Sequence, residues 1–196
     1  MTSDAHLDWL LISASTATAA GTLRVQVWRR LRSLGALYLQ QSVCLLPARP
    51  EVRTQVRRLT DRIRHQGGTA RTLSMAFTDS AEERAVIAEF NAARDAEYAE
   101  VLQRLPELRR EPADERARGN ITYAEVEESE ADLERFRTWL AKITARDYFD
   151  APGGPAVHAA IEQAAAELAA FEEAALHAEA GGPGQAPIRA RAGRRP

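Results

Sequence analysis

The stretch LQQSVCLLP, at residues 39–47, decides the fold because it places a short apolar segment between two helical patterns. Val43 and the residues after it favour a β-strand, as does LYL at 37–39, and two Gln residues separate the two pieces. Pro47 and Pro50 end the segment, since proline cannot donate a hydrogen bond to a sheet ladder. We expect either a hairpin or one bent strand at the middle of a small sheet.

Strand and helix patterns flank this segment on both sides. WLLISAS at 9–15 predicts a buried strand, and RTLSMAF at 71–77 predicts a half-buried strand with Leu73 on its apolar face. The apolar stripes of the two expected helices are Leu23, Val27, Leu31 and Leu34, and then Val52, Val56, Leu59 and Ile63. The order strand, helix, one or two strands, helix, strand predicts a ferredoxin-like α+β sandwich of the βαββαβ type over residues 8–78.

Beyond this sandwich the pattern becomes helical. Capping boxes at Ser80–Glu83 and Thr122–Glu125 predict two helix starts, and the polar segment 109–120 predicts an exposed loop between the helices. We therefore expect a helical extension over residues 79–178 that packs on the sandwich. The Gly-, Pro- and Arg-rich residues 179–196 predict a disordered tail.

The formal net charge of −2 hides a strong asymmetry along the chain. Residues 1–78 contain 11 Arg and 4 acidic residues, whereas residues 79–180 contain 24 acidic and 11 basic residues. Most of the early Arg residues fall off the apolar stripes of the two expected helices. They are Arg24, Arg29, Arg30, Arg32, Arg53, Arg57, Arg58, Arg62 and Arg64. Because guanidinium groups fork onto phosphates, these residues predict a DNA-binding surface.

A second interpretation assigns the same Arg residues to contacts within the protein or between its subunits. The expected helix after residue 122 is rich in carboxylates, namely Glu125, Glu127, Glu128, Glu130, Asp132 and Glu134. These could neutralise the Arg residues, and the chain would then be a protein–protein interaction module without enzymatic activity. The sequence contains no feature that separates this hypothesis from DNA binding.

Catalytic and cofactor motifs are not evident, so we predict neither catalytic residues, nor a metal, nor a cofactor. The four His residues are scattered, and no Ser lies in a Gly-framed nucleophile turn. The single Cys44 lies in an apolar run, which is typical of a core thiol in a reducing cytoplasm. No apolar run is long enough to span a membrane, and the N-terminus does not resemble a secretory signal. We expect Trp28 and Trp139 in the core or at an interface.

Several segments together resemble one family, the N-terminal domain of ChrB, a chromate-resistance regulator. They are WLLISAS (9–15), VQVWRRLRSLGALYLQQSVCLLP (25–47), FNAARDAEYAEVL (90–102) and TYAEVEESEADLERFRTWLAKITARDYFDAP (122–152). In the last segment, Arg146-Asp147 precedes two aromatic residues, Tyr148 and Phe149. This charged pair predicts either a salt bridge at a helix end or the wall of a pocket.

The resemblance implies a ferredoxin-like module followed by helices, and a transcriptional regulator of the ChrB type in the cytoplasm. We also expect a homodimer, because a single basic face covers too little duplex DNA for tight specific binding. The chain ends in an Arg-rich tail where ChrB continues into a second domain tied to the chromate response, so we expect a stand-alone version. The module is also similar to PaaX-type repressors and to the small CRISPR-associated endoribonucleases. The latter have a metal-binding Asp at the end of the first strand, where this chain has Ser13, Ala14 and Ser15. A residual nuclease is therefore the weakest of the three functional hypotheses.

Overall fold

The computed structural model describes residues 7–17, 21–118 and 123–180, and it contains four strands and five helices within them. The chain forms two compact units, the first made of Met1–Ala99 with Ala141–Pro155 and the second of Glu100–Leu140 with Ala156–Pro196. Three long helices have residues in both units. They are α3 (Ser80–Arg118), α4 (Tyr123–Thr144) and α5 (Gly154–Ala180). All but two residues of the tail expected at 179–196 lie outside the described residues.

The first unit contains a four-stranded sheet in the order β2-β3-β1-β4, with every neighbouring pair antiparallel. Its strands are β1 (Trp9–Ser15), β2 (Leu37–Gln40), β3 (Val43–Pro47) and β4 (Thr69–Met75). The stretch at 39–47 therefore forms the end of the first strand, the turn and the second strand of a hairpin, rather than one bent strand. Strand β1 lies between β3 and β4, which explains why its apolar run is almost continuous.

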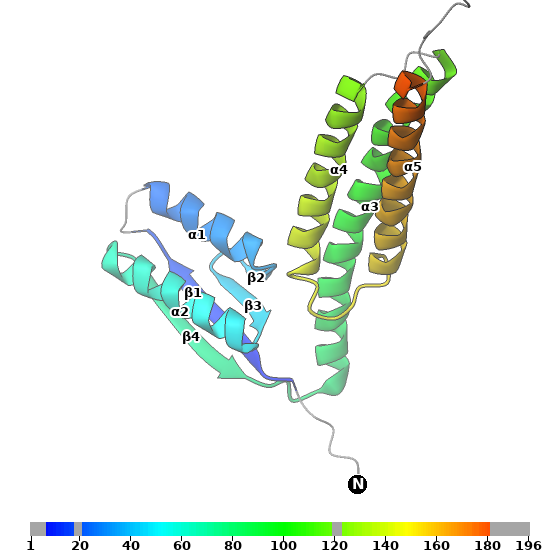
Figure 1. The fold of residues 1–196 in the computed structure, drawn as a ribbon. Coiled ribbons are helices and arrows are strands. Elements are labelled where there is room, and N and C mark those ends of the chain that lie inside the picture. Colours follow the sequence, from blue (N-terminus) through cyan, green and yellow to red (C-terminus); the bar gives the residue numbers. More distant parts are fainter. Residues whose placement is uncertain (1–6, 18–20, 119–122, 181–196) are drawn as a thin grey trace, which may run out of the picture. The chain divides into compact units, whose positions relative to one another are not determined.

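Helices α1 (Gly21–Ser33) and α2 (Pro50–His65) both cover one face of this sheet (Figure 1). The expected stripes are buried, and they pack in one core with alternate residues of β1 and β3. The strand register pairs Leu10 with Leu46 and Ile12 with Cys44. Helix α1 ends just before Gly35, whose φ of 71° lies in the left-handed region that glycine adopts without steric cost.

Trp9 anchors the opposite side of the sheet, because neighbouring residues of a strand point to opposite faces. Its side chain is fully buried, and its ring centroid lies 5.5 Å from Phe77, 5.8 Å from Phe90 and 5.6 Å from Phe149. The indole Nε1 donates a 2.7 Å hydrogen bond to Oε1 of Glu83. The start of α3 and the segment after α4 therefore belong to the core of the first unit.

Two details of the sheet and of α3 differ from the sequence predictions. Leu73 is 51% exposed, so its assignment to a buried face is wrong; β4 is an edge strand, and only Ala70 of its residues is buried. The cap of α3 is Asp79, whose Oδ1 accepts a 2.8 Å hydrogen bond from the N–H of Ala81. Glu83, expected in a capping box, instead accepts the hydrogen bond from Trp9.

The prediction of a loop at 109–120 is also wrong over most of this segment, because α3 continues to Arg118. Ala, Arg and Glu dominate residues 109–118, and their high helix propensity outweighs the polar character from which a loop was predicted. Residues 119–122, including the start of the second expected capping box, lie outside the described residues.

The second unit consists of parts of α3, α4 and α5, which lie side by side in Figure 1. Most large apolar residues of α4 and α5 are buried, whereas Phe136 is half-buried. Phe136 packs on Trp139, with ring centroids 6.1 Å apart, and the Arg104 guanidinium lies 5.4 Å from the Trp139 ring. None of the helices in the described residues is long and apolar enough to cross a membrane.

Candidate nucleic-acid interface

The nine Arg residues predicted to bind DNA are all exposed on the two helices that cover the sheet. Helix α1 contains four of them and no acidic residue. Helix α2 contains five of them and two acidic residues, Glu51 and Asp61. The apolar stripes of both helices face the sheet, so the arginines lie on the outer and lateral surfaces of the helices.

Five of these residues lie on the exposed sides of α1 and α2, and we call this group the basic face. It consists of Arg29, Arg30, Arg57, Arg58 and Arg62. Arg30 donates a hydrogen bond through Nη2 to Oε1 of Gln55, and this bond joins the outer sides of α1 and α2. Arg58 and Arg62 follow Gln55 at helical spacings of three and seven residues, so they lie on the same side of α2. Arg57 follows Arg53 by four residues, so it lies on the opposite flank of the same helix. None of the five forms an ion pair with another described residue.

Arg53 and Arg64 turn away from this face toward β4. Arg53 donates to the carbonyl oxygen of Ala48 at 3.0 Å and to Oγ of Ser74 at 3.1 Å, and it lies 3.4 Å from Oδ2 of Asp8. Arg64 donates to the carbonyl oxygen of Ala70 through both Nε and Nη2, and its Nη1 lies 3.2 Å from Oδ1 of Asp61. Both side chains have local structural partners, so they belong only to the margin of the predicted interface.

Arg24 and Arg32 lie on the other flank of α1, on the side of the β2–β3 hairpin. They are spaced four residues on either side of Trp28, so all three share one flank of the helix. The Arg32 guanidinium lies 5.2 Å from the Trp28 ring. Trp28 is 46% exposed, so of the two positions expected for it, core or interface, the structure excludes the core, whereas Trp139 is partly buried. The sequence signal for this flank was the spacing of Arg24, Trp28 and Arg32 outside the apolar stripe.

The carboxylates of the alternative hypothesis lie on α4, largely in the second unit. Glu127, Glu128, Glu130 and Glu134 are exposed, whereas Asp132 is partly buried and forms an ion pair with Arg135. The side chain of Glu125 lies outside the described residues.

Arg146 and Asp147 each bind α3 within the first unit. Arg146 contacts Glu97 through two nitrogens, at 2.8 and 3.3 Å. Asp147 accepts a 2.9 Å hydrogen bond from the Tyr98 hydroxyl and two more from the N–H of Ala151. No local sequence pattern indicates these partners, because they lie 49 residues earlier along the chain. The arrangement holds the segment after α4 against α3.

Tyr148 completes this contact, since its hydroxyl donates a 2.7 Å hydrogen bond to the carbonyl oxygen of Leu34. Burial is the main cause of the raised pKa of this hydroxyl, so Tyr148 stays protonated as a donor. Arg49 approaches from the other side, with its guanidinium 5.1 Å from the Tyr148 ring. The segment for which the sequence left a pocket wall as one of two alternatives is therefore packed into the core.

The end of β1 has the residues expected from the sequence. Ser13 and Ser15 lie at the end of the strand, and Ser15 accepts a 3.5 Å hydrogen bond from the N–H of Ala17. Among the described residues, no three His, Cys, Asp or Glu side chains lie together in a position to hold a metal ion.

Comparison with known proteins identifies the family. The family described as Protein ChrB, N-terminal, matches residues 24–181, which is most of the chain. Protein ChrB from Cupriavidus metallidurans is 34% identical over 101 residues, which make up 52% of this chain and 31% of that relative. No solved structure matches. The match covers α2, the three long helices and all but the first three residues of α1, and the chain belongs to the ChrB N-terminal family.

Proposed function

We propose that this chain is a ChrB-type transcriptional regulator that binds DNA in the cytoplasm through the basic face. The observation that carries the proposal is the density of exposed guanidinium groups on α1 and α2, seven of which, including all five of the basic face, form no ion pair with a described residue. Each can donate two parallel hydrogen bonds to a phosphate. Membership of the ChrB family adds chromate-resistance genes as the proposed regulatory target.

We also propose a ferredoxin-like module and a homodimer. The element order of the first unit and its strand order β2-β3-β1-β4 support the former. The small extent of the basic face supports the latter, because specific binding of duplex DNA by such surfaces commonly requires two copies on two half-sites. Sedimentation velocity at micromolar concentration tests the dimer, and a monomer at all concentrations would contradict it.

The DNA proposal is tested by fluorescence anisotropy with labelled duplex from the protein's own upstream region and a scrambled duplex. If all five arginines of the basic face contact phosphates, log Kd should depend on log salt with a slope of about 4.5, since each contact contributes about 0.9. The triple variant Arg29→Gln, Arg57→Gln, Arg58→Gln should lower this slope by about 2.7. Selectivity for the upstream duplex would support a regulator.

The matched control removes three charges from other exposed positions, as Arg71→Gln, Arg84→Gln, Arg137→Gln. It has the same net charge as the test variant, so it should lose affinity only through the long-range field. Equal losses in both variants would contradict a localised interface. No binding even at low salt would contradict DNA binding altogether and favour the alternative, a protein–protein interaction module whose basic and acidic halves neutralise each other.

A further inference from the structure

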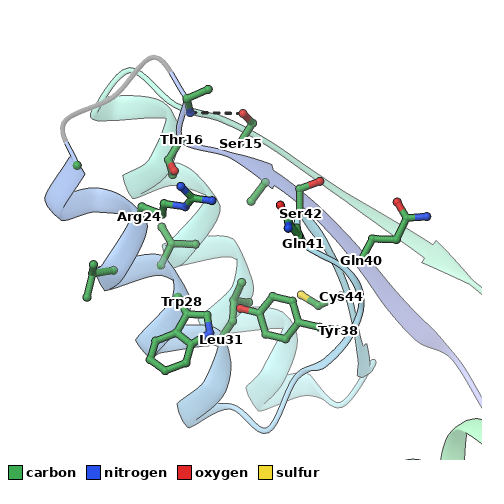
Figure 2. Close-up of a pocket in the computed structure, with 15 residues that line it drawn as sticks. Ser15, Thr16, Arg24, Trp28, Leu31, Tyr38, Gln40, Gln41, Ser42 and Cys44 are labelled. Atoms are coloured by element: carbon green, nitrogen blue, oxygen red, sulfur yellow. Dashed lines mark hydrogen bonds between the residues drawn. The ribbon is translucent and has the colours of Figure 1, made fainter.

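A cavity outside the basic face lies between α1 and the β2–β3 hairpin (Figure 2). Its volume is about 990 Å³, and it is open to solvent on one side. Trp28 projects from α1 and Tyr38 from β2 into this space, and Leu31 and Cys44 line its base. Gln41 and Ser42 line its wall at the hairpin turn.

The two aromatic rings are unusually exposed for residues of their size. Trp28 is 46% exposed and Tyr38 is 37% exposed, although Leu31 and Cys44 beside them are buried. Exposed aromatic side chains that face one cavity offer planar apolar area with few rotatable bonds, which favours stacking of a planar ligand.

The cavity has a single charge among its described lining residues, and that charge is positive. Figure 2 shows the Arg24 side chain reaching from α1 toward Gln41 and Ser42. Burial raises the pKa of the Cys44 thiol to about 12. Burial is also the main cause of the raised pKa of the Tyr38 hydroxyl, which is about 12 as well. Both groups are therefore neutral at pH 7. Arg24 forms no ion pair with a described residue. The site therefore combines an apolar base, hydrogen-bonding groups and one cation available to an anion.

We propose that this cavity binds a small aromatic carboxylate, with its ring system against Trp28 and Tyr38 and its carboxylate paired with Arg24. A guanidinium beside a partly desolvated aromatic wall is suited to a planar anion, because it can bind both carboxylate oxygens. The volume accommodates a bicyclic ring system. This inference goes beyond DNA binding, and it uses a flank of α1 distinct from the basic face.

Two-dimensional ¹H–¹⁵N spectra of the full chain, titrated with 2-naphthoate, test the proposal without DNA. A ligand of this size predicts a Kd on the order of 0.1–1 mM. The Trp28 indole N–H and the amides of Gln41 and Ser42 should shift, whereas the indole signals of Trp9 and Trp139 serve as internal controls. The uncharged amide, 2-naphthamide, should bind at least fivefold more weakly than 2-naphthoate.

Substitutions separate the charge from the aromatic wall. Arg24→Gln should abolish the preference for 2-naphthoate over 2-naphthamide, and Trp28→Ala should weaken both ligands at least fivefold. Arg29→Gln, which removes the same charge from α1 outside the cavity, should leave the affinity for 2-naphthoate within twofold. Retained dispersion of the spectra shows that each variant is folded.

Three outcomes would overturn the inference: no shifts up to 5 mM 2-naphthoate, shifts centred on Trp9 or Trp139, or equal effects of Arg24→Gln and Arg29→Gln. None of them depends on whether the basic face binds DNA. Conversely, the triple variant Arg29→Gln, Arg57→Gln, Arg58→Gln should show the same chemical-shift changes with 2-naphthoate even if it no longer binds DNA.

Discussion

The substitution Glu97→Gln should destabilise the protein far more than its position on the surface of a helix suggests. The Glu97 carboxylate lies 2.8 Å from Nη2 of Arg146 and 3.3 Å from Nε of Arg94. The Arg94 side chain is only 9% exposed, and its Nε and Nη1 have no well-directed hydrogen bond to a described residue. Glu97 is therefore the nearest countercharge for a buried cation.

Burial lowers the pKa of the Arg94 guanidinium, and Glu97 is the main opposing influence. Because arginine does not lose its proton in proteins, removal of the carboxylate leaves a buried positive charge beside a second one on Arg146. Breaking a buried ion pair costs about 3–5 kcal/mol. The Glu97 side chain is 26% exposed, and partial screening by water reduces the expected loss to about 2–4 kcal/mol.

Urea unfolding at pH 7, followed by circular dichroism, measures this loss. With a slope of about 2 kcal/mol per molar urea, the midpoint should fall by about 1–2 M. The control is Glu100→Gln, one turn further along α3, whose ion pair with Arg104 is exposed and should contribute less than about 1 kcal/mol. Adding Arg94→Met to Glu97→Gln should restore part of the stability, because it removes the uncompensated charge. Equal midpoints for Glu97→Gln and Glu100→Gln would refute the reasoning.

Two further predictions concern the core of the first unit. Gly35→Ala should lower the free energy of unfolding by about 1–3 kcal/mol, because φ is positive and a Cβ would lie 2.9 Å from Nη1 of Arg94. Gly67→Ala is the control, since φ is also positive but the space around a Cβ is open. It should lower the free energy of unfolding by only about 1 kcal/mol in the same urea assay. Equal losses would show that the approach to Arg94 is unimportant. Cys44, 1% exposed and with a pKa of about 12, should react negligibly with iodoacetamide at pH 9, whereas the urea-unfolded chain should react as an ordinary thiol with a pKa of about 8.5. Rapid alkylation of the folded protein at pH 9 would contradict this.

The sequence determined the local elements of the first unit with good accuracy. The strand at 9–15 has the expected bounds, α1 ends before Gly35, and α2 begins at Pro50, whereas β4 lies two residues earlier than the strand expected at 71–77. These features depend on apolar periodicity, proline and glycine, whose effects act within a few residues. The nine arginines could likewise be placed on exposed helix surfaces from their positions relative to the apolar stripes.

Only the tertiary structure decided which of these residues meet. Glu97 and Arg146 lie 49 residues apart, and no local pattern in α3 announces their contact. The cavity needs Trp28 of α1 opposite Tyr38 of β2, and Leu73 is exposed because β4 is an edge strand. Strand order and helix docking are set by the burial of the whole core, which a single stretch of sequence does not contain. The local sequence pattern thus determines which secondary structure and exposure each residue favours, and the packing of the whole core determines which residues come into contact.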